Sequence, residues 1–203
     1  MEPIIDDNKC RVYLINNFLN DNECDQLLKE IKLLPFERKD IVVYGKTWKM
    51  PRMTCSVKFG EYKTYTYNKV EEKPVDAGEY LTKLKNNIEG YLFEVLKLDD
   101  KFNFALLNYY KDGNDSVSAH SDSESSIRIN SPIASISLGQ SREFILKNKF
   151  IDETIKDETI KINLENGSLL LMLDKTQQLW THAINKSKKE LKERWNITFR
   201  CLN

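Results

Sequence analysis

The hydrophobic and polar positions of this chain follow two different periods, one in each half. In the first half, apolar residues recur every three or four positions in two stretches, which predicts amphipathic helices. The first helix is expected to begin after Asn20, which forms a capping-box pair with Glu23, and to end at Pro35. Its apolar positions are Leu27, Leu28, Ile31 and Leu34, and those of the second helix, over 75–97, are Leu81, Leu84, Ile88, Tyr91, Leu92 and Val95. Both helices are expected to buttress a sheet.

From Phe102 onward the pattern changes to short apolar runs separated by polar turns. These runs are FNFALLNYY, SPIASISLG, REFILKN, TIKINLENGSLLLML, WTHAI and WNITFRC. Their even spacing predicts an α+β, mainly β protein whose core is a closed double-sheet jelly roll, with a tight turn at Asn166-Gly167. In the first half, a strand is expected over 9–19, a hairpin over 41–51 with Gly45-Lys46 near its tip, and an alternating strand over 64–67. The acidic segment 150–158 is expected to be the solvated end of a hairpin.

Length and composition fit one domain over residues 1–203, with the helices and the hairpin in about 1–100 and the jelly roll in about 101–203. No apolar run approaches the roughly 18 residues that a membrane helix needs, so no membrane association is expected. The N-terminal segment MEPIIDDNK lacks the apolar region of a secretory signal. Four scattered cysteines without a C-x-x-C pair indicate free thiols in an intracellular, reducing compartment.

The formal net charge is zero and the pI is about 6.8, which counts mildly against a nucleic-acid partner. The local distribution is less even, because residues 186–200 contain six basic residues against Glu190 and Glu193. The basic residues are Lys186, Lys188, Lys189, Lys192, Arg194 and Arg200. Two interpretations of the lysines remain open: a solvated face, or a surface that contacts phosphates.

The chain contains two histidines, and their surroundings suggest a metal site. His120 and Asp122 form a His-x-Asp motif, and His182 is the other histidine. Two imidazoles and one carboxylate that leave open positions are the facial triad of Fe(II) oxygenases. Arg194 and Arg200 follow His182 in the strand-like run RWNITFR, and a guanidinium can grip the distal carboxylate of 2-oxoglutarate with its planar fork.

The same run also has a period that suits a cosubstrate slot. Arg194, Asn196, Thr198 and Arg200 are separated by even numbers of residues, so they point to one face of a strand. A core strand does not direct two arginines inward unless an anion compensates them.

Together these motifs resemble the AlkB family of Fe(II)/2-oxoglutarate-dependent nucleic-acid dealkylases, which have a double-stranded β-helix core and a nucleotide-recognition lid. The matching pieces are N-x-Y-x-D-G over 108–113, H-x-D at His120 and Asp122, S-P-I-A-S over 131–135, the lone His182, and R-x-N-x-T-F-R over 194–200. The segments YGKTWKMPR (44–52) and TYTY (64–67) resemble the branch that repairs methylated bases in double-stranded DNA.

The resemblance assigns roles to the core residues and implies Fe(II), 2-oxoglutarate and dioxygen as cofactor and cosubstrates. Arg194, helped by Asn108 and Tyr110, is expected to bind the C5 carboxylate of 2-oxoglutarate. Arg200 is expected nearer the C1 carboxylate and the metal, and is counted with the catalytic residues His120, Asp122 and His182.

The resemblance also implies contacts to the nucleic acid. Tyr44 at the hairpin is a candidate wedge that enters the base stack, although its pattern alone also fits packing under the hairpin. Arg52 resembles a base- or phosphate-contacting arginine, and Tyr67, with Tyr65 nearby, is expected to stack on the flipped base opposite His120.

Three further contacts come from the matching positions of the C-terminal half. Glu124 matches a carboxylate that hydrogen-bonds the exocyclic amine of the base, and an exposed loop glutamate is the alternative. Lys186, Lys188 and Lys189 are expected to contact the opposite strand through phosphates.

The expected function is therefore demethylation of 1-methyladenine and 3-methylcytosine in DNA, with release of formaldehyde, by a monomer. In a eukaryote the protein would be expected in the nucleus. Two alternatives remain: an RNA demethylase or a protein-modifying relative with the same iron site, and a jelly roll that has lost catalysis.

Overall fold

The computed structural model describes residues 1–43, 45–61, 66–67, 70–71, 73–150, 158–189 and 191–203, and it has two packed sheets. The eight-stranded sheet has the order β1 (Glu2–Asp6), β2 (Cys10–Ile15), β14 (Leu169–Asp174), β11 (Ile133–Gly139), β16 (Arg194–Arg200), β9 (Phe104–Tyr110), β5 (Met53–Lys58), β8 (Val75–Asp76). The four-stranded sheet has the order β10 (Val117–His120), β15 (Trp180–Ile184), β12 (Arg142–Asn148), β13 (Thr159–Leu164). Two hairpins stand apart from both sheets: β3 (Asp40–Val43) with β4 (Lys46–Lys49), and β6 (Thr66–Tyr67) with β7 (Val70–Glu71).

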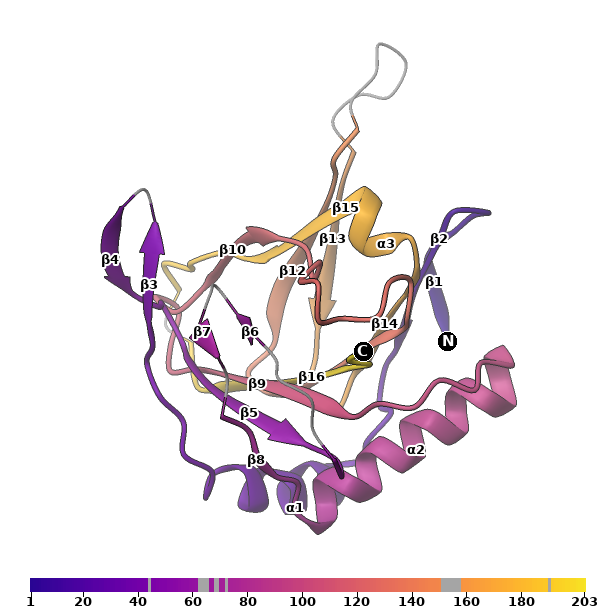
Figure 1. Ribbon diagram of the computed structural model, residues 1–203, viewed down its shortest axis with the longest axis horizontal. Coiled ribbons are helices and arrows are strands. Elements are labelled where there is room, and N and C mark those ends of the chain that lie inside the picture. Colours follow the sequence, from indigo (N-terminus) through magenta and orange to yellow (C-terminus); the bar gives the residue numbers. More distant parts are fainter. Residues whose placement is uncertain (44, 62–65, 68–69, 72, 151–157, 190) are drawn as a thin grey trace.

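The larger sheet lies between the helices and the smaller sheet (Figure 1). Helices α1 (Asp21–Ile31) and α2 (Glu79–Leu96) cover its outer face, and the short α3 (Thr176–Leu179) follows β14. One apolar cluster joins both long helices to the outer face, and a second fills the space between the sheets. The jelly-roll prediction is confirmed, and β1, β2, β5 and β8 show that the first hundred residues also supply strands to the core sheet.

Strand β16 is buried on both faces, and its side chains alternate between the layer of helices and the interior between the sheets. Trp195, Ile197 and Phe199 point toward the helices and belong to the outer apolar cluster. The polar residues between them line a pocket between the sheets, as the period-two pattern predicts. An apolar strand therefore carries one wholly polar face into the interior.

The two long helices agree with the sequence pattern in position but not at every boundary. The capping box at α1 is present, because Asn20 Oδ1 accepts from the Glu23 amide at 3.0 Å and Glu23 Oε2 accepts from the Asn20 amide at 2.9 Å. The helix ends at Ile31, before the expected stop at Pro35. Helix α2 begins later than expected because residues 75–76 pair with β5. The sequence pattern predicts Val95 on the buried face of this helix, but Val95 is 49% exposed, because the buried positions end at Leu92.

Several strand predictions are confirmed and others need correction. The strand expected over 9–19 is confirmed over Cys10–Ile15 (β2), and the hairpin expected over 41–51 is β3–β4, closed by the pair Val43↔Lys46. The tight turn at Asn166-Gly167 is confirmed, and the strands that it joins, β13 and β14, belong to different sheets. β1 and β10 were not expected, and residues 151–157 of the acidic segment lie outside the described part of the chain.

The four cysteines are free and buried, as their spacing predicts. No helix in the described part of the chain has both the length and the apolar character needed to cross a membrane.

Replacing Gly167 by alanine should destabilise the protein more than the same change at Gly60. Both glycines have positive φ, +74° and +79°, which costs an alanine about 1–2 kcal/mol. A Cβ at Gly167 would lie 2.4 Å from the Leu19 carbonyl oxygen, whereas none would lie within 4 Å at Gly60. We expect a loss of about 1–2 kcal/mol for Gly60→Ala and about 2–4 kcal/mol for Gly167→Ala in urea unfolding. Equal losses would mean that the Leu19 backbone yields.

Candidate active site

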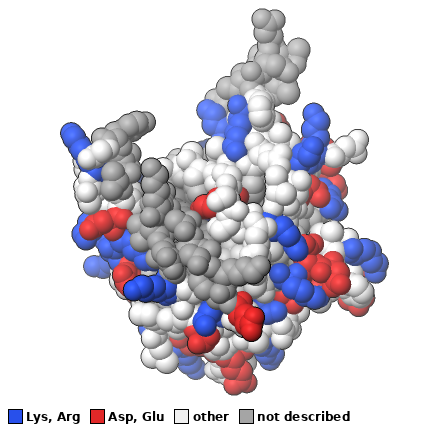
Figure 2. Space-filling view, viewed as in Figure 1, with Lys and Arg blue, Asp and Glu red and all other residues white. Residues whose placement is uncertain are grey.

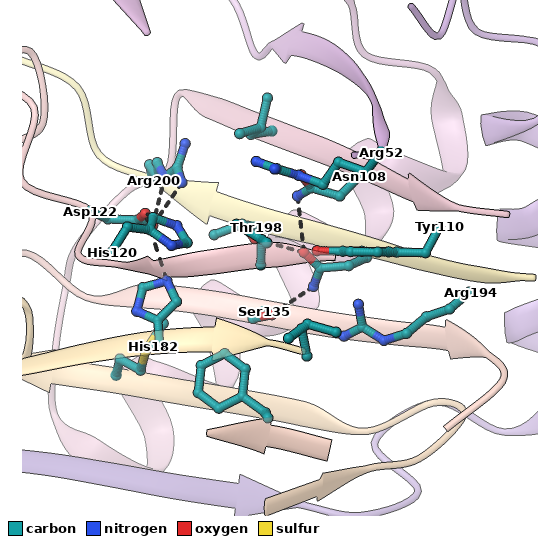
Figure 3. A pocket seen from close by; sticks show the side chains of 16 residues that line it. Arg52, Asn108, Tyr110, His120, Asp122, Ser135, His182, Arg194, Thr198 and Arg200 are labelled. Atoms are coloured by element: carbon teal, nitrogen blue, oxygen red, sulfur yellow. Dashed lines mark hydrogen bonds and ion pairs between the residues drawn. The ribbon is translucent and has the colours of Figure 1, made fainter. Parts of the chain in front are cut away.

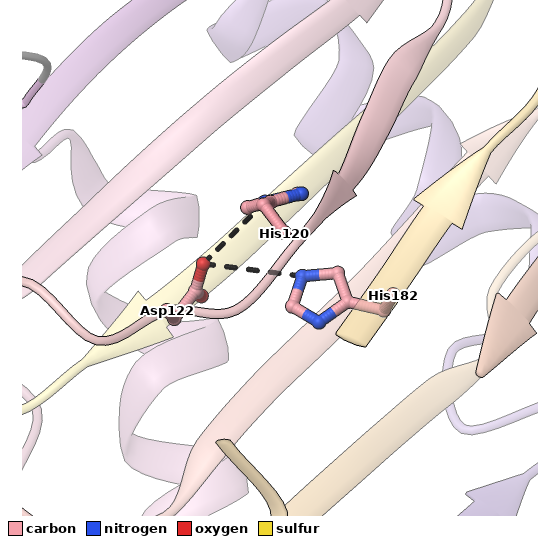
Figure 4. A group of neighbouring side chains, drawn as sticks. All are labelled: His120, Asp122 and His182. Atoms are coloured by element: carbon pink, nitrogen blue, oxygen red, sulfur yellow. Dashed lines mark ion pairs between the residues drawn. The ribbon is translucent and has the colours of Figure 1, made fainter. Parts of the chain in front are cut away.

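Two histidines meet because β10 and β15 are antiparallel neighbours in the smaller sheet. His120 and His182 are direct partners in the register of this pair, and their ring centroids are 4.3 Å apart. Asp122 follows β10 and turns toward both rings (Figure 4). Its Oδ1 atom lies 3.6 Å from Nε2 of His120 and 3.9 Å from Nε2 of His182. The ligand atoms of the three residues all lie within 4.8 Å of one another, as one small cation requires.

The protonation of the three side chains suits a cation. Nδ1 of His120 lies 2.9 Å from the Ser118 carbonyl oxygen and donates to it, because a carbonyl only accepts. Nε2 is therefore the ring nitrogen that faces Asp122. Burial lowers the pKa of His182 to about 3, with help from His120 and against the charge of Asp122. Burial alone would raise the pKa of Asp122, but Arg200 and the two imidazoles outweigh it and lower the pKa to about 2. At neutral pH Asp122 is therefore a carboxylate and His182 a neutral imidazole.

Arg200 binds one carboxylate oxygen of Asp122 and leaves the other oxygen without a hydrogen bond. Its Nε and Nη2 atoms donate to Oδ2 at 3.0 and 2.7 Å, and both side chains are almost completely buried. Oδ1 is buried without a hydrogen-bond partner, and it is the oxygen that faces the two imidazoles. A buried carboxylate oxygen without a partner is costly. The donor set therefore fits a divalent transition metal such as iron, held by Asp122 Oδ1 and the two Nε2 atoms.

At the opposite end of the same pocket, the guanidinium of Arg194 also has atoms without a hydrogen-bond partner (Figure 3). Arg194 is 2% exposed, and its Nη2 donates to Ser137 Oγ at 2.9 Å. Its Nε and Nη1 atoms are buried without a hydrogen-bond partner, and its guanidinium lies 5.1 Å from the centre of the Tyr110 ring. Burial lowers the pKa of Arg194, a direction that a bound anion would oppose. This end of the pocket fits a carboxylate.

A chain of amides and hydroxyls connects the two ends along the floor of the pocket. Arg52 Nε donates to Asn108 Oδ1 at 2.6 Å, and Asn108 Nδ2 donates to Asn196 Oδ1 at 3.2 Å. Asn196 also accepts from Thr198 Oγ1 at 3.0 Å and donates to Ser135 Oγ at 2.7 Å. All predicted cosubstrate residues therefore line one pocket. Two of them, Asn196 and Thr198, are already hydrogen-bonded within its floor. Arg52, expected on the lid, is 5% exposed and lies in the pocket beside Asn108.

Sequence reasoning missed three residues that fix the site. Ser135 and Ser137 support Asn196 and Arg194, and two serines at period two within an apolar strand are the signal that could have revealed them. The Oε1 atom of Gln177, in α3, accepts a hydrogen bond from the backbone amide of Asp122 at 2.9 Å. No local pattern marks Gln177, because the contact joins separate parts of the chain.

Apart from Arg52, the predicted nucleic-acid residues lie outside this pocket or outside the described residues. Tyr44 and Tyr65 are not among the described residues, and Tyr67 lies in β6, of which the backbone alone is described. Glu124 is half-buried and lines a neighbouring hollow that it shares with Asp122. Lys186, Lys188 and Lys189 are exposed between β15 and β16. Lys and Arg side chains are visible on both projecting hairpins, β3–β4 and β12–β13, and over the rest of this face they are interspersed with Asp and Glu (Figure 2).

Backbone contacts join the lysine segment and the β3–β4 hairpin to one loop, 111–116. The Ser187 amide donates to the Gly113 carbonyl at 2.8 Å, and the Ser116 amide donates to the Pro51 carbonyl at 2.8 Å. Arg38, before the hairpin, forms a two-oxygen ion pair with the buried Asp115 at 3.0 and 3.1 Å. The hairpin and the lysines are thus fixed beside β10, the strand that ends in His120.

Known proteins share both the sequence and the fold. The 2OG-Fe(II) oxygenase superfamily matches residues 11–200. The DNA oxidative demethylase ALKBH2 is 32% identical over 186 residues in Bos taurus and 31% in Homo sapiens, in each case over 89% of this chain. The alpha-ketoglutarate-dependent dioxygenase alkB homolog 3 of Mus musculus is 34% identical over 95% of this chain. The chain spans 63%, 67% and 66% of the lengths of these three relatives.

Two solved structures share the fold at low identity. OsALKBH1 superposes with a TM-score of 0.58 and 19% identity, over 94% of this chain and 97% of its own. An oxidoreductase of the 2OG-Fe(II) oxygenase family from Burkholderia pseudomallei gives a TM-score of 0.62 at 12% identity, over 93% and 84% of the two chains. Matched in sequence over nearly its whole length and carrying the expected triad, this chain belongs to the 2OG-Fe(II) oxygenase superfamily and, within it, to the AlkB family.

Proposed function

We propose that this protein is an Fe(II)- and 2-oxoglutarate-dependent oxidative demethylase that repairs 1-methyladenine and 3-methylcytosine in DNA. One observation carries the proposal: one pocket has a carboxylate oxygen without a hydrogen-bond partner at one end, and at the other end a guanidinium with two such nitrogens. Iron fits the first end and the distal carboxylate of 2-oxoglutarate fits the second. The names of the ALKBH2 relatives, DNA oxidative demethylases, support the reaction and the nucleic-acid substrate.

The residues of the chain divide the work of this reaction. His120, Asp122 and His182 would hold iron, and Arg200 keeps Asp122 ionised and oriented. Bound iron would activate dioxygen so that 2-oxoglutarate is oxidised to succinate and carbon dioxide, while the N-methyl group is hydroxylated and leaves as formaldehyde. Arg194, held by Ser137, would orient the cosubstrate in the pocket between the sheets.

Duplex DNA is the proposed substrate form. The backbone contact between Pro51 and Ser116 holds the β3–β4 hairpin beside β10, which supports a substrate contact by this hairpin. We assign Tyr44 the role of entering the base stack and Tyr67 that of stacking on the flipped base. Methylation that breaks Watson–Crick pairing lowers the energy needed to flip the base, which helps selection. Lys186, Lys188 and Lys189 on the adjoining loop would contact phosphates.

The direct test is a product assay with purified protein, Fe(II), 2-oxoglutarate and ascorbate. Matched duplex DNA, single-stranded DNA and RNA oligomers would each carry one 1-methyladenine, and formaldehyde and the restored base would be measured. We expect demethylation that requires both iron and 2-oxoglutarate and is at least as fast on the duplex as on the single strand. Activity confined to RNA would make the protein an RNA demethylase. Succinate formation without demethylation of any oligomer would overturn the proposed substrate and leave a protein-modifying dioxygenase as the alternative.

Arg194→Ala should weaken 2-oxoglutarate binding selectively. Removal of a charge-assisted pair should raise the KM for 2-oxoglutarate about 10- to 100-fold while iron affinity, measured by calorimetry, stays nearly constant. The matched control is Arg142→Lys, because Arg142 is equally buried near Tyr110 but donates to the carbonyls of Asp112, Asp115 and Asn185. This control should lower the thermal midpoint without a selective rise in KM. An unchanged KM in Arg194→Ala would remove Arg194 from the cosubstrate site.

Tyr44→Ala should reduce repair of duplex DNA about 10-fold and repair of single strands much less. The reason is that only the duplex needs a side chain to fill the space left by the flipped base. Tyr44→Phe, which keeps the ring, should retain most duplex activity. Equal losses on both substrates would show that Tyr44 supports the fold instead of probing the stack.

A further inference from the structure

Trp48 on strand β4 is exposed in a way that packing does not explain. The chain has three tryptophans, and Trp180 and Trp195 are 4% and 7% exposed, whereas Trp48 is 58% exposed. Every residue of β4 is exposed, and Trp48 has no ring contact with any described residue. Tryptophan is highly buried on average and is enriched at interfaces, so an exposed indole on a hairpin beside the active site is a candidate contact for a partner.

The hairpin presents this ring from a fixed base beside the active site. Met50, which follows β4, is 2% exposed, its amide donates to the Lys39 carbonyl at 2.8 Å and its carbonyl accepts from Arg38 at 2.9 Å. Arg52, two residues further on, already lines the catalytic pocket. Trp48 therefore stands on an anchored arm that leads directly into the pocket, and the β3–β4 arm projects away from both main sheets (Figure 1).

The charges around Trp48 identify the kind of partner. Lys46 precedes Trp48 by two residues, so both side chains lie on one face of β4. Lys49 is paired with Asp40 at 2.8 Å, whereas Lys46 forms no ion pair within the described part of the chain. Basic side chains are visible on this projecting hairpin in Figure 2. One aromatic ring beside a free ammonium group is the combination that binds single-stranded nucleic acid, by stacking on a base and attracting its phosphate. A protein partner would need a wider apolar patch than one indole.

We propose that Trp48 is a stacking platform for an unpaired base next to the methylated one, with Lys46 contacting the adjoining phosphate. This inference rests on the proposed function and adds to it a contact outside the catalytic pocket. The contact covers a base that is left unstacked when its neighbour is flipped, and it would hold the strand at the pocket mouth. It requires neither iron nor a methyl group, so it can be measured apart from catalysis.

The test uses the intrinsic fluorescence of Trp48 in iron-free protein. An unmodified oligothymidylate of about 12 nucleotides, a length within the range of single-strand sites, would be titrated in while its own labelled anisotropy reports binding. We expect quenching of the exposed tryptophan emission in step with binding, and weaker quenching by a fully paired duplex of equal length. Trp48→Phe should bind nearly as well with little change in emission. Trp48→Ala should bind about 10-fold more weakly, and Lys46→Gln should reduce the salt dependence of binding.

The outcomes separate this inference from the proposed function. Saturating binding without quenching, or equal affinity of Trp48→Ala and the natural protein, would overturn the stacking role whatever the demethylase assay shows. Emission that changes with protein concentration alone would identify a self-association surface and would also overturn it. Quenching without demethylation of any oligomer would keep the stacking platform and reject the proposed reaction.

Discussion

The ion pair between Arg200 and Asp122 is the interaction on which the rest of the site depends. Two charges buried between the sheets are tolerated only when they are paired, and breaking such a pair leaves an uncompensated charge at a cost of about 3–5 kcal/mol. The pair is also asymmetric, because both arginine nitrogens bind the same carboxylate oxygen. The other oxygen is thereby directed at the two imidazoles, and the ion pair produces a metal site as well as a stable core.

The pocket contains buried charged groups with unpartnered atoms at two separate points. Asp122 Oδ1 lacks a partner at one end, and Arg194 Nε and Nη1 lack partners at the other. The amide floor between them, built on Asn108 and Asn196, is internally hydrogen-bonded. A ligand with a metal-chelating end and a distal carboxylate satisfies both points at once. This arrangement explains why a mainly apolar jelly roll retains buried arginines on one strand face.

The proposed nucleic-acid surface is assembled from segments that are distant in sequence. Asp115 and its loop connect the β3–β4 hairpin to the lysine segment between β15 and β16, and β10 begins immediately after that loop. The metal ligand His120 and the outer contacts therefore share one support. A shift of this loop would move the hairpin relative to the triad, so the proposed substrate contacts and the metal site share a mechanical connection.

The sequence by itself determined the features that depend on local spacing. The period of β16 predicted which side chains share a face, the Asn20–Glu23 pair predicted the helix start, and the short apolar runs predicted the jelly roll. The His-x-Asp motif and the remaining histidine predicted the triad, because the chain offers no other imidazole.

Tertiary structure decided the features that depend on long-range pairing. The register that places His120 opposite His182, the support of Asp122 by Gln177, the burial of Arg52 and the exposure of Trp48 have no local signal. Periodicity fixes the direction of a side chain relative to its own strand, but strand pairing decides what that side chain meets.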